Sequence, residues 1–219
     1  TLPIVYGTAR VGTEGELHAW RIAGDSATRL GETSSEGAEP CHLTVDPSGR
    51  LLIVTNYTTS TLGLQRLAPD GAFEGSIALL KLSGGGPELA RQDDAHPHQV
   101  FFDGDTLLCI DLGADLVREF SVDFSRSGAE MLTEIRTTLV PANTGPRHCV
   151  VLPDGRLAIS GELSSSLIVG RRGGAGWASV PASRAPGPGK TRWTRNYPGD
   201  LQRSPDGRHV YFANRSLDT

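Results

Sequence analysis

A β-hairpin motif recurs along the chain and constrains the fold more than any other feature of the sequence. Each copy is a short apolar run, a tight turn and a second apolar run, and the four turns centre on Gly49, Gly104, Gly155 and Gly207. The copies are 55, 51 and 52 residues apart, a period typical of repeat architectures. Residues 3–8 look like the second strand of an earlier copy.

The turn sequences explain why each copy should form a hairpin. Asp46-Pro47-Ser48-Gly49 and Pro153-Asp154-Gly155-Arg156 combine a proline of fixed φ, an aspartate that caps backbone groups and a glycine for positive φ. A weaker pair of alternating strands follows each hairpin, as in Thr61–Leu67 and Asp115–Val122. Four strands per period predict an all-β fold, a β-propeller of four-stranded antiparallel blades. The length accommodates about four to five such blades, which we expect to form one domain over residues 1–219.

Composition argues against several other classes of protein. The 219 residues carry a net charge of −4, whereas a nucleic-acid partner requires a basic patch. No run of about 18 apolar residues is present, so we expect no contact with a membrane, and the first residues lack the pattern of a signal peptide. Cys41, Cys109 and Cys149 fit neither a zinc site nor a disulfide framework. We therefore expect reduced thiols and a cytoplasmic protein.

The hairpin topology predicts where polar site residues should gather. The start of the first strand and the end of the second lie opposite the turn, and in a propeller the first strand of each blade lines the central channel. In the four copies the same position before the turn holds His42, His98, His148 and Asp200. The ends of the second strands provide a further polar set, which comprises Asn56, Asp111, Glu162 and Arg215.

Two interpretations of these polar residues remain open at this point. They could cap backbone groups and hold neighbouring blades together, which suits His42, Asn56 and Asp111 best. Alternatively, His98, Arg147 and Glu162 form a working set, because a neutral histidine, a carboxylate and a guanidinium provide acid–base chemistry with an anion clamp.

Several motifs resemble those of the lactonase-type seven-bladed propellers, which include the propeller 6-phosphogluconolactonases and the fungal 3-carboxy-cis,cis-muconate lactonizing enzymes. The resemblance covers essentially the whole chain, and it is the ordered set of motifs that is specific. It implies that His98, Arg147 and Glu162 are the catalytic group and that Arg215 contacts an anion. The motifs are His96-Pro97-His98-Gln99-Val100, Asp111-Leu112-Gly113-Ala114-Asp115, Gly145-Pro146-Arg147-His148, Glu162-Leu163 and Asn214-Arg215.

The sequence departs from the family pattern at two positions and in length. Gly161 replaces an asparagine before the Glu-Leu pair, which could loosen the loop that aims Glu162. Asp200 replaces a glutamate and shortens that carboxylate by one methylene. Seven blades need roughly 350 residues, so we expect this chain to be a fragment of a longer protein.

The resemblance implies a metal-independent, cofactor-free lactone hydrolase of carbohydrate metabolism, most similar to 6-phosphogluconolactonase. The expected partner is a small anionic sugar lactone. Glu162 or His98 would take a proton from water, while Arg147 stabilises the oxyanion or holds the substrate anion. A muconate-type lactonizing cycloisomerase and a non-catalytic binding or scaffold propeller are the alternatives. The residues expected to bind substrate are His96, His148, Arg215, Asp200, His42 and Asn56.

Overall fold

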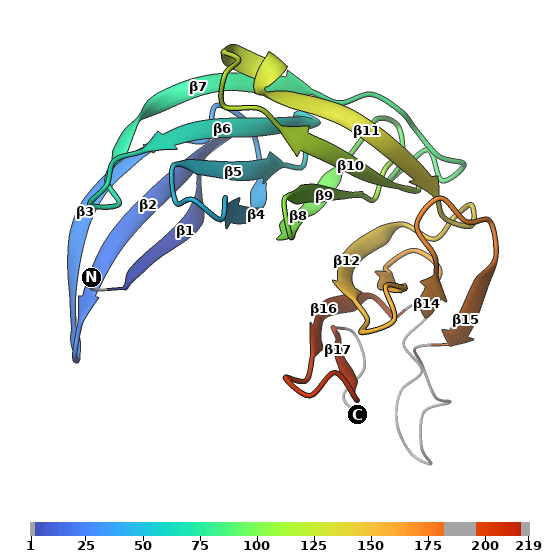
Figure 1. Ribbon diagram of the computed structural model, residues 1–219. Helices are drawn as coiled ribbons and strands as arrows, with labels where there is room; N and C mark the ends of the chain where they lie inside the picture. The colour runs from blue at the N-terminus through green and yellow to red at the C-terminus, as the bar shows by residue number, and fades with distance from the viewer. Residues whose placement is uncertain (1–2, 182–195, 216–219) are drawn as a thin grey trace. The chain divides into compact units, whose positions relative to one another are not determined.

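A computed structural model describes residues 3–181 and 196–215, and these residues form an all-β fold (Figure 1). Within this part of the chain, helix is confined to the 3-10 turn η1 (Gly128–Met131). The predicted fold class is confirmed. The strands are β1 (Ile4–Val11), β2 (Glu14–Ala23), β3 (Ser26–Ser34), β4 (Pro40–Val45), β5 (Leu51–Asn56), β6 (Thr61–Leu67), β7 (Phe73–Lys81), β8 (Pro97–Asp103), β9 (Thr106–Asp111), β10 (Leu116–Val122), β11 (Leu132–Leu139), β12 (Pro146–Val151), β13 (Leu157–Gly161), β14 (Ser166–Gly170), β15 (Trp177–Pro181), β16 (Pro198–Arg203) and β17 (Val210–Asn214).

The strands form separate sheets in which neighbours in sequence are neighbours in space. Three sheets have four strands, in the orders β4-β5-β6-β7, β11-β10-β9-β8 and β12-β13-β14-β15. Each matches one predicted period, hairpin first and weaker pair second. The described residues also form a three-stranded sheet, β1-β2-β3, and a hairpin, β16-β17. Strand β1 therefore stands where the sequence placed the second strand of an earlier copy.

The four predicted turns all contain the predicted glycine at positive φ. The φ angles are 74° at Gly49, 61° at Gly104, 78° at Gly155 and 70° at Gly207. This left-handed backbone carries almost no steric cost for glycine, whereas a residue with a Cβ is strained there. The turn residues thus fix the hairpin register, as the sequence indicated.

A β-bulge interrupts the first strand of three of these hairpins at the end opposite the turn. The strand register shifts between Pro40 and His42, between Pro146 and His148, and between Pro198 and Leu201. A bulge adds one unpaired residue to a strand and redirects its side chain. Arg147 is the inserted residue in β12, so the irregularity falls on a predicted catalytic residue.

The chain divides into two compact units. The first contains residues 1–83, 95–109 and 119–135, and the second contains residues 84–94, 110–118 and 136–219. The boundary between them falls within β9, β10 and β11, so it does not follow the sheets. The expectation of one domain over residues 1–219 stays a prediction.

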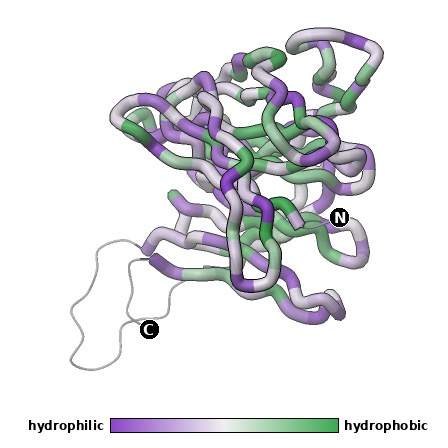
Figure 2. The backbone as a smooth tube through the Cα atoms, turned by 90° about the vertical axis from the view of Figure 1, so that its left-hand side faces the viewer, coloured by the Kyte–Doolittle hydropathy of each residue, from purple (hydrophilic) through white to green (hydrophobic). Residues whose placement is uncertain are grey.

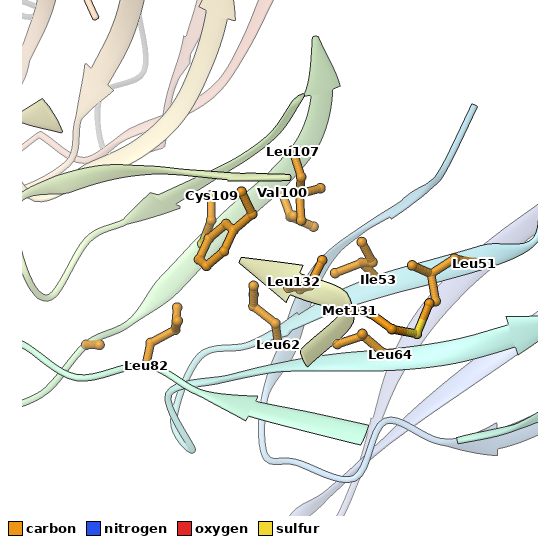
Figure 3. Close-up of a cluster of buried hydrophobic side chains, with 12 residues drawn as sticks. Leu51, Ile53, Leu62, Leu64, Leu82, Val100, Leu107, Cys109, Met131 and Leu132 are labelled. Atoms are coloured by element: carbon orange, nitrogen blue, oxygen red, sulfur yellow. The ribbon is translucent and has the colours of Figure 1, made fainter. Parts of the chain in front are cut away.

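The first unit is held together by an apolar core. Met131 and Leu132 lie among side chains of β5 and β6, as Figure 3 shows. All members of this cluster are at most 6% exposed, and burial of each aliphatic side chain stabilises the fold by about 1.5–3 kcal/mol. The labelled members are Leu51, Ile53, Leu62, Leu64, Leu82, Val100, Leu107, Cys109, Met131 and Leu132.

In the second unit the hairpin β16-β17 packs directly on the hairpin β12-β13. The Ser160 hydroxyl donates a hydrogen bond to the Gly199 carbonyl at 3.1 Å. At the other end, a Cβ on Gly207 would lie 2.5 Å from the Pro153 ring, so the turns of these two hairpins are adjacent. Within this unit, consecutive copies therefore present their turns at one end and their strand termini at the other.

Other features of the chain agree with the composition. Hydrophobic and hydrophilic residues are interleaved along the backbone (Figure 2), and β2 alternates between buried and more exposed positions. Cys41, Cys109 and Cys149 are thiols and not disulfides. No helix of the described residues is long and apolar enough to cross a membrane.

Candidate active site

Among the described residues of the second unit, a buried carboxylate is surrounded by three guanidiniums. The Glu162 side chain is 4% exposed. Its Oε1 accepts a hydrogen bond from Arg91 at 2.6 Å, and its Oε2 lies 3.1 Å from Nε of Arg147 and also pairs with Arg215. We call these four residues the Glu162 cluster. Burial of a carboxylate requires compensation of this kind, since an unpaired buried charge is strongly destabilising.

Glu162 is placed by the loop that precedes β12. Its backbone N–H donates to the Gly145 carbonyl at 2.8 Å immediately after β13 ends. Gly161 is closely packed there, because a Cβ at this position would collide with Ser164 and lie 3.0 Å from the Thr144 methyl group. The glycine therefore fits a close approach of two loops and does not leave a loose one.

A buried aspartate fixes the loop that delivers Arg147. Asp115 accepts hydrogen bonds from the backbone N–H groups of Asn143 and Gly145, both at 2.8 Å. Burial raises the pKa of Asp115, and the hydrogen bonds from Gln92, Gly145 and Asn143 oppose that rise. Because Gly145 also receives the Glu162 N–H, the same short loop positions both members of the Arg147–Glu162 ion pair.

Arg91 reaches the cluster from the connection between β7 and β8. The neighbouring Gln92 is buried, and its side-chain amide donates to the Leu112 carbonyl at 2.9 Å. Its backbone carbonyl accepts a hydrogen bond from the Gly86 N–H at 3.0 Å. A Cβ on Gly86 would collide with the Gln92 side chain, which explains the glycine-rich sequence. The loop is thus anchored by Gln92, and Arg91 projects from it.

Arg215 and Tyr197 complete the polar wall of a cavity. The Arg215 backbone N–H and its Nε both donate to the Tyr197 carbonyl, at 3.2 and 3.3 Å. Arg91, Glu162, Tyr197 and Arg215 line a cavity of about 460 Å³. That volume lies within the range of small-molecule sites, roughly 300–1,000 Å³.

A histidine–aspartate pair lies beside the cluster. Nδ1 of His148 is 2.7 Å from Oδ1 of Asp200. Burial lowers the pKa of His148, with a further lowering from the Arg147 charge, and Asp200 opposes both. Burial acts to raise the pKa of Asp200, but hydrogen bonds from His148, Gln202 and the Leu201 N–H outweigh it and lower that pKa. His148 is therefore a neutral imidazole near neutral pH, held in position by Asp200.

The other predicted histidines belong to the first unit. His96 stacks on Tyr57 with ring centroids 4.4 Å apart, and its Nδ1 is 2.9 Å from the Tyr57 carbonyl. His98 meets the same ring edge-on at 5.7 Å, and Nδ1 of His42 is 3.5 Å from the Val100 N–H. The distance of His98 from Arg147 and Glu162 stays a prediction, because those two residues lie in the second unit.

Asn56 and Asp111 have contacts typical of structural residues. The fully buried Asn56 amide donates to the Ser35 carbonyl at 3.0 Å and to the Thr61 hydroxyl at 3.1 Å. Asp111 accepts from the Ala114 N–H at 3.1 Å and pairs with Nε of Arg118 at 3.0 Å. The bonds to Thr61 and Ala114 close the turns after β5 and β9, and the bond to Ser35 links Asn56 to the segment after β3. These contacts fit the first of the two interpretations, in which polar residues cap backbone groups.

One group of side chains in the first unit has the composition of a metal site. Ligand atoms of Glu16, His18 and Glu32 lie within 4.8 Å of one another on the partly exposed face of β2 and β3. Arg29 pairs with Glu32 and lies 3.3 Å from Nδ1 of His18. Because the Arg29 guanidinium neutralises Glu32 and His18 contacts Glu16, the arrangement is that of a surface ion-pair network.

Comparisons with known proteins decide the family. The family model described as lactonase, seven-bladed β-propeller, matches residues 2–219. This chain is a member of the lactonase family. A 6-phosphogluconolactonase of Formosa agariphila is 28% identical over 213 residues, which are 93% of this chain and 58% of that protein. The Bacillus subtilis 6-phosphogluconolactonase is 26% identical and is matched over 62% of its length by 99% of this chain.

Solved structures agree with the lactonase assignment. A putative 6-phosphogluconolactonase of Bacteroides fragilis is 25% identical with a TM-score of 0.80, over 98% of this chain and 61% of that one. A Lactobacillus plantarum protein is 28% identical with a TM-score of 0.79, over 97% of this chain and 61% of that one. The chain thus spans about three fifths of these relatives.

Some of the predicted site residues lie together in the structure, and their catalytic and binding roles stay predictions. Arg147, Glu162 and Arg215 were predicted site residues, and the second unit brings them together. His148 and Asp200 were predicted separately and form a pair. Arg91 and Tyr197 were missed, because both lie in irregular segments outside the hairpin repeat. The glycine run before Arg91 was the available signal, since consecutive glycines often mark a close backbone approach.

Proposed function

We propose that this protein is a lactone hydrolase, a carboxylic ester hydrolase that opens an anionic sugar lactone in the manner of 6-phosphogluconolactonase. The observation that carries the proposal is the Glu162 cluster, in which one buried carboxylate pairs with three guanidiniums. The carboxylate and two of these guanidiniums, those of Arg91 and Arg215, line a cavity of about 460 Å³. The relatives named 6-phosphogluconolactonase support the substrate class. Since the chain spans about three fifths of those relatives, the activity is proposed for the whole protein.

The reaction assigns a role to each group. Glu162 takes a proton from a water molecule as the water oxygen bonds to the lactone carbonyl carbon. Arg147 stabilises the oxyanion that develops on the carbonyl oxygen, since a fixed guanidinium needs no reorganisation at that moment. The bond from the carbonyl carbon to the ring oxygen then breaks, and the ring oxygen receives a proton. The product is a hydroxy acid, which releases one proton at neutral pH.

Other residues are assigned to binding or to the second proton transfer. We propose that His98 protonates the leaving ring oxygen or exchanges roles with Glu162. Arg215 and His148 contact the anionic group, with Asp200 orienting the imidazole. The contributions of His96, His42 and Asn56 to substrate binding stay predictions. The three thiols also favour a cytoplasmic protein, since disulfides are rare there.

The test is acid release from 6-phosphogluconolactone at constant pH, corrected for spontaneous opening. Glu162→Gln should lower kcat by at least about 10²-fold with a smaller change in KM, because it removes a proton acceptor and preserves the shape. Glu88→Gln is the matched control, since the Glu88 backbone carbonyl and not its carboxylate accepts the Arg91 N–H. Full activity of Glu162→Gln would exclude this mechanism. Binding without turnover in the unmodified protein would favour the scaffold alternative.

A further inference from the structure

The three guanidiniums of the Glu162 cluster are not equivalent. The Arg147 side chain is 17% exposed and is fixed by the β12 bulge, whereas those of Arg91 and Arg215 are 36% and 44% exposed. Arg91 and Arg215 also line the cavity, and Arg147 does not. The cluster therefore has an inner ion pair, Arg147–Glu162, and two outer guanidiniums that face the space where a ligand would bind.

The outer arginines also divide the carboxylate oxygens of Glu162 between them. Arg91 donates to Oε1 at 2.6 Å, while Arg215 shares Oε2 with Arg147. A carboxylate that activates water must accept a hydrogen bond from that water. In this arrangement the Arg91 guanidinium already takes one of the two lone-pair positions of Oε1, and it competes there with such a water.

The cluster itself contains more positive than negative groups. Three guanidiniums exceed one carboxylate by two positive charges, and the neighbouring Asp200 carboxylate is directed to His148 and Gln202. Two cavity-facing guanidiniums match a phosphate dianion, because each planar fork can donate two parallel hydrogen bonds to phosphate oxygens.

We propose that the phosphate group of the substrate draws Arg91 and Arg215 away from Glu162, so that the substrate itself uncovers the base. The proposal rests on the proposed lactonase function and deepens it. Arg147 remains on Oε2 and holds the carboxylate in place. Oε1 loses Arg91 and accepts the hydrogen bond of the attacking water. The phosphate thus acts on kcat as well as on binding, and Arg91 is a specificity-determining residue.

Competition for the same arginines gives a test that needs no turnover. Binding of inorganic phosphate is measured by calorimetry at pH 8, where the dianion predominates. Glu162→Gln should bind phosphate about tenfold more tightly, because the competing carboxylate is gone, and Arg91→Gln should bind it about tenfold more weakly. Glu88→Gln removes a nearby charge without touching the guanidinium and should match the unmodified protein. Equal phosphate affinity in Glu162→Gln and the unmodified protein would overturn the proposal.

A second measurement uses a lactone without a phosphate group. Glucono-1,5-lactone leaves Arg91 on Glu162, so its kcat should be low and should rise about tenfold when phosphate is added, after correction for buffer catalysis. In Arg91→Gln the kcat for this neutral lactone should be raised without phosphate, while kcat/KM for the phosphorylated lactone falls. A purely structural role of Arg91 would lower both activities together and would refute the exchange. If no lactone is opened, the proposed function fails, and the phosphate titrations still decide whether Arg91 and Glu162 compete.

Discussion

Replacement of Asp115 by alanine should destabilise the second unit and displace Arg147. The carboxylate accepts hydrogen bonds from Gly145 and Asn143, with a further one from Gln92. An unsatisfied buried donor costs about 1–3 kcal/mol, so we assign about 2 kcal/mol to the buried Gly145 N–H and less to the other two. Asp115 has a φ of 54°, and alanine tolerates this left-handed backbone less well, by about 1 kcal/mol.

Relief of the buried charge offsets part of this loss, so the expected net destabilisation is about 3 kcal/mol. For a chain of this size, that corresponds to a fall in Tm of roughly 6–12 °C. The measurement is a thermal melt followed by circular dichroism. The matched control is Asp206→Ala, which removes an aspartate from an exposed turn where it accepts the Arg208 N–H at 3.0 Å. A fall in Tm no larger than that of the control would refute the assignment of Asp115 as the anchor of this loop.

Asp115→Asn separates the charge from the shape. Because burial raises the pKa of Asp115 above 3.8, the folded protein binds this proton more tightly than the unfolded chain does. The stability contribution of Asp115 therefore decreases as pH rises from 3.8 through the raised pKa. Melts of Asp115→Asn over that window should lack this decrease. An unchanged pH dependence would show that Asp115 ionises as it does in the unfolded chain.

Three further predictions concern other residues. Burial lowers the pKa of His148, so the contribution of the neutral imidazole to the free energy of unfolding is complete above pH 6.5 and is lost as pH falls from 6.5 towards the lowered pKa. The variant His148→Asn should not show this loss when Tm is measured at a series of pH values. Arg147→Lys should lower kcat/KM by about 10²-fold, because a point charge cannot reproduce a fixed planar donor, and near-normal lactone hydrolysis would contradict this. Leu107→Ala should cost about 2–5 kcal/mol in urea unfolding, because Leu107 is fully buried in the first-unit core, and a loss below about 1 kcal/mol would show that the core closes around the cavity.

The repeat and its turns could be predicted from the sequence because they depend on local chemistry. Gly155 follows Pro153 and Asp154, and no other part of the chain is needed to favour a turn there. The same locality placed Glu162 at the end of a second strand. The position of a residue within the repeat thus predicted its position within a sheet.

The bulge at Arg147 and the arrival of Arg91 could not be predicted in this way. A register shift depends on how two strands pair, and Pro146-Arg147-His148 has no composition that demands one. Arg91 reaches Glu162, 71 residues away in sequence, from a loop that Gln92 anchors by its bond to the Leu112 carbonyl. That bond depends on the tertiary structure, so the alternation of apolar and polar residues in the sequence does not predict it.

The bulge also separates two kinds of position in these hairpins. The inserted residue can vary, whereas the residues that pair in the strand ladder are constrained. Strand pairing resumes at His42 with Thr55 and at His148 with Ser160, whatever residue is inserted just before. Cys41 occupies in β4 the position that Arg147 occupies in β12. Mutations at this position can therefore alter chemistry in one module while the ladder hydrogen bonds remain. When such a hairpin is duplicated, a substitution of one codon can change the side chain at the bulge of one copy. The side chains at the bulges of the other copies then stay as they were.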